Sequence, residues 1–127
     1  MVITGIHIAS YGKDFKEEYK LIDLLEEINQ IDGIERIRFV SPHPKDFTDD
    51  VIEAIADCDK VCKLIHLPLQ SGNTKVLKEM NRKYTKEQYL NLVEKMKNRI
   101  PNLTLSTDII VGFPGETEEE FEKTYQF

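Results

Sequence analysis

Cysteine is scarce in this sequence, and long apolar runs are missing from it. The 127 residues include only two cysteines, Cys58 and Cys62, which are too few for a framework of disulfide bonds. Purely apolar runs extend over only a few residues, whereas a helix needs roughly 20 to cross a bilayer. The first residues also lack the charged start and the apolar stretch of a secretory signal. We therefore expect a cytoplasmic protein that has no contact with a membrane.

A basic stripe is missing as well. The net charge is −6, and the 17 lysines and arginines are scattered among 23 aspartates and glutamates. Proteins that bind nucleic acid by themselves usually gather basic residues, because neutralising phosphates supplies much of their affinity. If the protein acts on RNA, its main RNA-binding surface should therefore lie outside these residues. The hydrophobic share of 40% and the charged share of 31% are typical of about one folded globular domain.

The sequence does contain an alternation of strand and helix patterns. Short, β-branched apolar segments predict four strands, at residues 2–8, 36–41, 64–69 and 103–111. Helical spacing and end signals predict helices at residues 16–31, 49–57, 76–80 and 86–99, and from 117 onward. Capping boxes mark two of the helix starts, Thr85 with Gln88 and Thr117 with Glu120. This alternation predicts an α/β fold of parallel (β/α) repeats, as part of a barrel or of an open sheet.

The predicted strand ends carry glycine, proline and small polar residues. Ligands of parallel α/β folds bind beyond the carboxyl ends of the strands. The four loops at these ends are Ser10-Tyr11-Gly12, Pro42-His43-Pro44, Gln70-Ser71-Gly72 and residues 112–116. Each of them could be an ordinary turn, but the four together favour a ligand site.

The loop at residues 112–116 precedes a capped helix start, so its free N–H groups could hold an anion or the edge of a ribose. It matches neither the dinucleotide-binding pattern nor the P-loop. Asp108 is a polar residue inside an apolar strand. A buried carboxylate needs either hydrogen-bonding partners or a functional role, and the sequence leaves both interpretations open.

Histidines and cysteines raise the question of a metal site. His7, His43 and His66 lie on or just after three successive predicted strands, although a single histidine per strand is more often a hydrogen-bonded core or strand-end residue. Cys58 and Cys62 have C-x-x-x-C spacing, but Ile65 stands where the third cysteine of a cluster-binding triplet would fall. We therefore favour packing at a helix end for this pair and assign no metal ligand.

Several motifs, taken in order, give the sequence a resemblance to a known family. Residues 66–72 read His-Leu-Pro-Leu-Gln-Ser-Gly, and residues 107–117 read Thr-Asp-Ile-Ile-Val-Gly-Phe-Pro-Gly-Glu-Thr. Met80-Asn81-Arg82 and Tyr84-Thr85 lie between them. Together they resemble the radical-SAM methylthiotransferases of the MiaB type over essentially the whole chain.

The resemblance implies a partial TIM-type barrel, of which residues 1–127 would be a central fragment of about four strands. Upstream, such enzymes have an auxiliary iron–sulfur cluster domain and a loop whose cysteines hold a four-iron four-sulfur cluster. This cluster cleaves S-adenosylmethionine to a radical. A small RNA-binding domain follows downstream. The tRNA substrate would therefore be bound mainly by regions outside this chain. We expect the isolated fragment to be inactive and able to self-associate through open sheet edges.

The resemblance also suggests which residues would face S-adenosylmethionine. Gln70 and Ser71 would lie near its ribose or methionine part, and Ser10 and Tyr11 fit the same pattern. The adenine would contact the backbone of the segment from Asp108 through Gly112, Phe113, Pro114 and Gly115. The family often shows G-x-I-x-G-x-x-E in this segment. Here Asp108 takes the first glycine position, and the glutamate comes one residue late. No catalytic residue is assigned.

The motifs leave the substrate open. Ser41-Pro42-His43-Pro44 and residues 66–72 resemble the branch that adds a methylthio group to isopentenylated adenosine beside the tRNA anticodon. Residues 5–12 resemble the branch that modifies threonylcarbamoyl-adenosine. A third branch modifies an aspartate of a ribosomal protein and matches least well. Two other classes remain: a phosphate-binding α/β barrel enzyme without an iron–sulfur cluster, and a non-enzymatic module kept for folding or partner binding.

Overall fold

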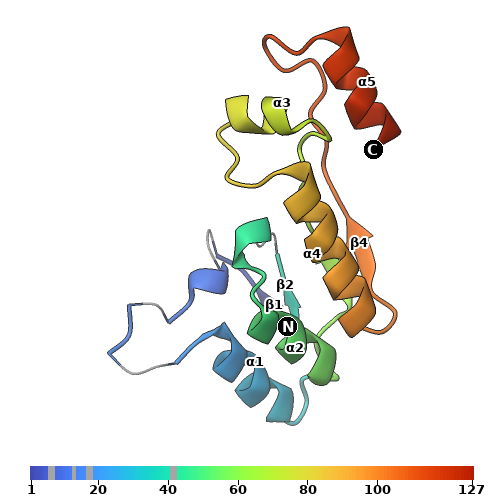
Figure 1. Ribbon diagram of the computed structural model, residues 1–127. Coiled ribbons are helices and arrows are strands. Elements are labelled where there is room, and N and C mark those ends of the chain that lie inside the picture. The colour runs from blue at the N-terminus through green and yellow to red at the C-terminus, as the bar shows by residue number, and fades with distance from the viewer. Residues whose placement is uncertain (6–7, 13, 17–18, 41–42) are drawn as a thin grey trace.

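A computed structural model describes residues 1–5, 8–12, 14–16, 19–40 and 43–127. Strands and helices alternate along these residues, as predicted for an α/β protein (Figure 1). The elements in chain order are β1 (Val2–Ile3), η1 (Ile8–Ser10), α1 (Leu21–Gln30), β2 (Arg38–Phe39), η2 (Pro44–Asp46), α2 (Asp49–Asp57), β3 (Leu64–His66), α3 (Thr74–Glu79), α4 (Lys86–Arg99), β4 (Thr104–Ser106) and α5 (Glu118–Gln126).

All strand pairs of the described residues are parallel. β1 pairs with β2, and β3 pairs with β4, which gives two sheets of two strands each. A single parallel bridge between Ile37 and Val61 links the two sheets. The Ile37 N–H donates to the Lys60 carbonyl at 2.7 Å, and the Cys62 N–H donates to the Ile37 carbonyl at 2.9 Å. The predicted parallel α/β class is confirmed, but these strands do not form one continuous four-stranded sheet.

The strands are shorter than the sequence patterns predicted. Of the strand expected at residues 2–8, the described residues form only β1, and Ile8 instead begins a turn of 3₁₀ helix. His7 lies outside the described residues. The strand expected at residues 64–69 ends at His66. After the bond from the Leu67 N–H to the Ser106 carbonyl, the Leu69 N–H donates to the Thr107 side chain in place of a backbone carbonyl, and the regular ladder stops. Pairing with the segment that follows β4 resumes only at the bridge between Gln70 and Ile109.

The helices agree better with their local signals. α4 has the predicted bounds, and both halves of its capping box form: the Gln88 N–H donates to Thr85 Oγ1 at 3.2 Å, and the Thr85 N–H donates to Gln88 Oε1 at 2.9 Å. α1 begins at Leu21, five residues later than predicted. α3 begins earlier than predicted, because the Asn73 side chain accepts from the Lys75 N–H at 2.8 Å and caps the helix.

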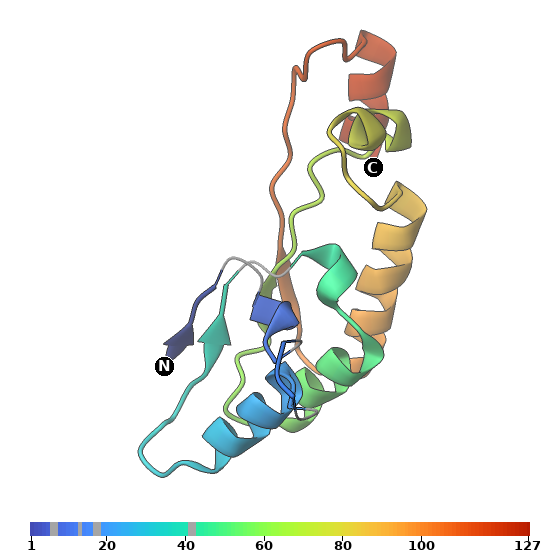
Figure 2. The same cartoon turned by 90° about the vertical axis from the view of Figure 1, so that its left-hand side faces the viewer.

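The core lies on one face of the strands. In Figure 2, α1, α2 and α4 lie on one side of the strands, and no helix covers the opposite side of β1 and β2. Side chains alternate along β3 and the segment after it: Ile65, Leu67 and Leu69 are buried, whereas Leu64 is 40% exposed. We call the side away from the helices the open face. The largest fully buried side chains are Leu21, Leu25, Ile37, Ile52, Ile55, Leu67, Leu77, Met96 and Ile100.

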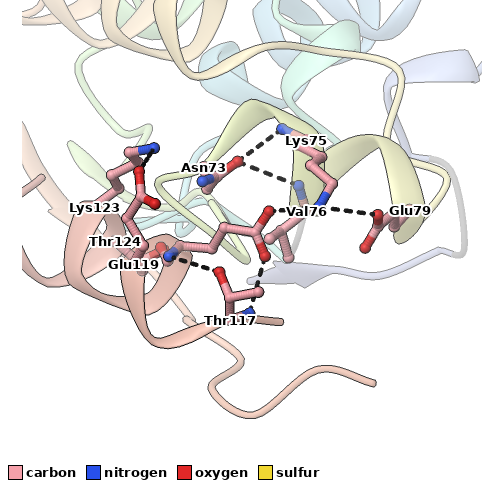
Figure 3. A network of polar contacts seen from close by, with 9 residues as sticks. Asn73, Lys75, Val76, Glu79, Thr117, Glu119, Lys123 and Thr124 are labelled. Carbon is pink, nitrogen blue, oxygen red and sulfur yellow. Dashed lines mark hydrogen bonds and ion pairs between the residues drawn. The ribbon is translucent and has the colours of Figure 1, made fainter. Parts of the chain in front are cut away.

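A polar network joins α5 to α3, far from α1 and α2 (Figures 1 and 3). The Lys75 ammonium donates to Glu120 Oε1 at 2.7 Å, and Glu120 Oε2 accepts from the Thr117 N–H at 2.9 Å. Gly72 packs so closely here that an added Cβ would lie 2.9 Å from the Thr124 Cα atom and 2.8 Å from the Phe127 Cβ atom. The end of the described chain is therefore held against the loop that follows β3.

The stability of this contact should depend on pH. The Lys75 ammonium, helped by the Thr117 N–H, lowers the pKa of Glu120 to about 2, below an ordinary value of about 4.3. A lowered pKa in the folded state contributes stability above about pH 4, and this contribution is lost as the pH falls towards 2. We expect Glu120→Gln to flatten this part of the pH profile of the free energy of unfolding, measured by urea denaturation.

The exposed Glu118 of the same helix provides a matched control. Glu118→Gln removes the same charge outside the Lys75 contact, so its unfolding free energy should follow the wild-type pH profile. If both variants flattened the profile equally, the overall charge and not the Lys75–Glu120 pair would be responsible.

Candidate functional site

The carboxyl ends of β3 and β4 meet at Gln70. The Gln70 N–H donates to the Asp108 carbonyl at 2.9 Å, and the Ile110 N–H donates to the Gln70 carbonyl at 2.8 Å. Gln70 has a φ angle of 73°. This lies in the left-handed region, which is unfavourable for residues other than Gly, Asn and Asp. Such strain costs roughly 1–3 kcal/mol and gathers at functional sites. Gln70 is therefore the strongest backbone sign of a site in this region.

Hydroxyl groups support the irregular segment that leads to Gln70. The Leu69 N–H donates to Thr107 Oγ1 at 2.8 Å, in place of a backbone partner. The Tyr84 hydroxyl donates to the carbonyls of Pro68 and Leu69, at 3.2 and 3.0 Å. The Tyr89 hydroxyl donates to the Leu67 carbonyl at 2.8 Å. Burial raises the pKa of both phenols, which keeps them protonated as donors.

Three polar side chains meet on the open face of β3 and β4. His66 Nδ1 lies 2.9 Å from Ser106 Oγ, and His66 Nε2 lies 3.1 Å from Asp108 Oδ2. We call these three residues the His66 cluster. Asp108 does not have the buried position that its apolar neighbours suggested, since 67% of its side chain is exposed. The reason is the alternation of side chains along β4, which places Asp108 on the same face as Ser106.

The loop at residues 112–116 binds its own carboxylate. Glu116 Oε2 accepts from the N–H groups of Gly112 and Phe113, at 2.8 and 3.2 Å. Gly112 and Gly115 have φ angles of 70° and 87°, which favour glycine and allow the tight turns around Pro114. The N–H groups of Gly112 and Phe113, two of those that the sequence offered to an anion or a ribose, are thus occupied by Glu116.

The same loop shows two features that suit S-adenosylmethionine. Glu116 Oε1 is buried and has no hydrogen-bond partner among the described residues, so the loop holds an acceptor that lacks a donor. Ile109, Ile110 and Val111 are 46%, 43% and 62% exposed, and such apolar surface suits the flat adenine ring. The residues present therefore fit a ligand that combines a planar base with hydrogen-bond donors.

The other predicted contacts lie in two different settings. The Ser71 side chain is fully buried. Its Oγ lies 3.1 Å from Thr124 Oγ1 and accepts from the Asn73 N–H, so its hydroxyl supports the α5 contact and faces no surface. Ser10 ends η1, and the ring of the following Tyr11 packs edge-on against Phe15 at 5.4 Å. The structure gathers Gln70, Asp108 and residues 112–115 at the ends of β3 and β4, whereas Ser10 and Tyr11 belong to the η1 region.

The remaining histidine and cysteines have local roles. His43 caps η2, where its Nδ1 accepts from the Lys45 N–H at 3.2 Å. Cys58 ends α2 and is buried, and this burial raises the pKa of its thiol. Among the described residues, no group of three or more metal-binding side chains occurs. In the same part of the chain, no helix has both the length and the apolar character to cross a membrane.

The His66 cluster is the part of the site that the sequence reasoning missed. The sequence suggested His66 as a metal ligand or a hydrogen-bonded strand-end residue, and Asp108 as a buried carboxylate or a neighbour of the cofactor's adenine, but it did not pair the two residues. The two residues are 42 positions apart, so their contact depends on the register that pairs His66 with Ser106. In a strand, every second side chain points to the same face. This two-residue period, applied to both predicted strands, was the signal that could have placed Asp108 beside His66.

Parallel strands, helices on one face and a polar site at the strand ends define an α/β protein of the type that binds ligands beyond its strands. The family comparison gives the particular family. The sequence matches the radical SAM superfamily over residues 3–127, and the chain belongs to this family.

Curated relatives with high identity have one name in common, tRNA-2-methylthio-N(6)-dimethylallyladenosine synthase. The relative from Clostridium botulinum strain Loch Maree is 60% identical over 98% of this chain. Relatives from Alkaliphilus oremlandii and Clostridium beijerinckii are 58% and 57% identical, over 98% and 99% of this chain. The chain spans only 28%, 26% and 28% of the lengths of these three relatives.

The tyrosine support of β3 leads to a stability prediction. Tyr89→Phe removes the donor to the Leu67 carbonyl and leaves a buried acceptor unsatisfied. We expect a loss of about 1–3 kcal/mol in the free energy of unfolding, measured by urea denaturation. Tyr125, which is 78% exposed, provides the control: Tyr125→Phe should leave stability unchanged. Equal effects of the two variants would mean that the Tyr89 hydroxyl contributes nothing at Leu67.

Proposed function

We propose that this chain is the central barrel section of a tRNA methylthiotransferase. The complete enzyme would add a methylthio group to an adenosine that already carries a dimethylallyl group. The observation that carries this proposal is the identity of 57–60% to relatives of that name, over 98–99% of the chain. The relatives' printed name favours this substrate over the threonylcarbamoyl-adenosine and ribosomal-protein alternatives.

We propose that the described strands are part of a larger parallel barrel. Three observations support this arrangement: every strand pair is parallel, the bridge between Ile37 and Val61 links β2 to the chain leading into β3, and the helices cover a single face. In a closed barrel the helices form the outer layer and the strands enclose the interior. The open face of β3 and β4 would then point towards that interior.

S-adenosylmethionine would lie at the ends of β3 and β4. The adenine would pack on the exposed apolar residues 109–111, and Gln70 would present its side chain to the ribose or methionine part. When bound next to an iron–sulfur cluster, the cofactor supplies a radical for hydrogen abstraction. This chain would position the cofactor and shield it from water.

The cluster ligands would come from another part of the complete protein. The sequence has only two cysteines and no C-x-x-x-C-x-x-C triplet, and Cys58 ends α2 on the helix side, in the hydrophobic core. We therefore expect residues 1–127 alone to take up no stoichiometric iron–sulfur cluster. Cluster uptake after anaerobic reconstitution, lost on Cys58→Ala and Cys62→Ala substitution, would contradict this expectation.

The proposed function can be tested with the complete enzyme. Reconstituted anaerobically, it should convert N6-dimethylallyladenosine in tRNA to its methylthio derivative in the presence of S-adenosylmethionine and a reductant. Mass spectrometry of the digested tRNA would detect the added methylthio group. The matched control is tRNA that lacks the dimethylallyl group, which should remain unmodified. Modification of threonylcarbamoyl-adenosine instead would contradict the proposed substrate, and no methylthiolation at all would contradict the proposed reaction.

A further inference from the structure

The His66 cluster provides a charged group on the open face of β3 and β4. Side chains of this face include Leu64 and Ile110, which are 40% and 43% exposed. Asp108 is the only charged residue in the open-face series 64, 66, 68 and 70 of one strand segment and 104, 106, 108 and 110 of the other. Because 67% of the Asp108 side chain is exposed, its carboxylate is accessible to hydrogen-bond donors of a ligand.

His66 supplies only part of what this carboxylate can accept. Its Nε2 reaches Asp108 Oδ2 at 3.1 Å, whereas an ionised carboxylate can accept about four hydrogen bonds. With Asp108 ionised, the network assigns the proton to His66 Nε2 and makes Nδ1 the acceptor of the Ser106 hydroxyl. Bonds on both ring nitrogens fix the imidazole plane, and the imidazole in turn fixes the carboxylate. Asp108 therefore has a defined orientation and still has free acceptor positions.

We propose that the His66 cluster binds the target nucleoside, with Asp108 accepting hydrogen bonds from its hydroxyl or N–H groups. In this proposal, which rests on the proposed function, His66 is a positioning residue. An accessible carboxylate on this face suits a nucleoside, because a ribose offers hydroxyl groups that can donate to it. An ion pair at a solvent-exposed position gives little stability, so cross-strand pairing alone accounts poorly for this arrangement.

Both S-adenosylmethionine and the target adenosine contain a ribose, so both could supply these donors. In the proposed arrangement the cofactor lies at the ends of β3 and β4, against Gln70 and residues 109–111. His66 and Ser106 pair with each other before those ends, and their side chains lie on the open face, which would point towards the barrel interior. We therefore assign the cluster to the target nucleoside.

The first test uses Asp108→Asn in the complete, reconstituted enzyme. Asparagine keeps the shape but replaces one acceptor oxygen by a donor and removes the charge. We expect the dissociation constant for an anticodon stem-loop RNA with N6-dimethylallyladenosine to rise about 10-fold or more, as for the loss of a charge-assisted hydrogen bond. The dissociation constant for S-adenosylmethionine, measured by calorimetry, should change less than about 2-fold. Thr104→Ala, two residues before Ser106 on the same face, should change neither value.

The second test separates positioning from simple folding. A glutamine amide nitrogen can replace His66 Nε2, whereas an asparagine amide nitrogen replaces Nδ1 only. His66→Gln should therefore retain much of the RNA affinity, while His66→Asn and His66→Ala should both lose about as much of it as Asp108→Asn. A residue that only held the strands together would show no such difference between the glutamine and asparagine variants.

Three results would overturn the inference. An equal rise in both dissociation constants, or a rise for S-adenosylmethionine alone, would assign the cluster to the cofactor. Unchanged affinities with a lower melting temperature would show a purely structural pair. Each of these results leaves the proposed function intact if the wild-type enzyme binds dimethylallylated RNA more tightly than unmodified RNA. Wild-type enzyme that binds both RNAs alike would contradict the proposed function itself.

Discussion

The hydrogen bond from the Leu69 N–H to Thr107 Oγ1 is the interaction on which the site depends. The last regular bond of the β3–β4 ladder runs from the Leu67 N–H to the Ser106 carbonyl, and hydroxyl groups take over at the next residues: Thr107 accepts from Leu69, and Tyr84 and Tyr89 donate to the carbonyls of residues 67–69. Leaving a buried polar group unpaired costs about 1–3 kcal/mol, so these hydroxyls stabilise the irregular segment. They also fix the path into Gln70, where the chain adopts a left-handed conformation that a regular strand would not reach.

One-sided packing gives the strands two different faces. Ile65, Leu67 and Leu69 point into the helices, and the intervening residues are left to the open face. Polar side chains at the strand ends, His66 and Asp108 above all, can therefore serve a ligand without weakening the core. Stability and binding are separated by the two-residue period of the strand, so a change on one face should leave the other largely intact. The contact between α5 and α3 adds a separate support, because it holds the loop after Gln70 from outside.

Local signals in the sequence predicted the helices well, because a capping box and a proline act within a few residues. α4 begins after Thr85 and ends before Pro101, as expected. Strand lengths were predicted less well, since they depend on the partner strand: β3 reads as an apolar run to Leu69, but its ladder ends where the Leu69 N–H bonds to the Thr107 side chain. The α/β class and the strand ends at Gln70 and residues 112–115 could be predicted. The bond between His66 and Asp108 could not, because it is set by the register of two strands far apart in the sequence.

The hydrogen bonds that Glu116 makes within its own loop determine which ligands the loop after β4 excludes. Its carboxylate already occupies the Gly112 and Phe113 N–H groups, which would otherwise be an attractive nest for phosphate. Any free anion would have to displace the Glu116 carboxylate. Because this carboxylate is tethered to the loop, its effective concentration there is far higher than the concentration of a free anion. Phosphate and the phosphate groups of ordinary nucleotides, both abundant in cells, are therefore poor competitors at this position. The carboxylate of Glu116 thus acts as a built-in counter-ion, and a positive or neutral ligand meets no competition from it.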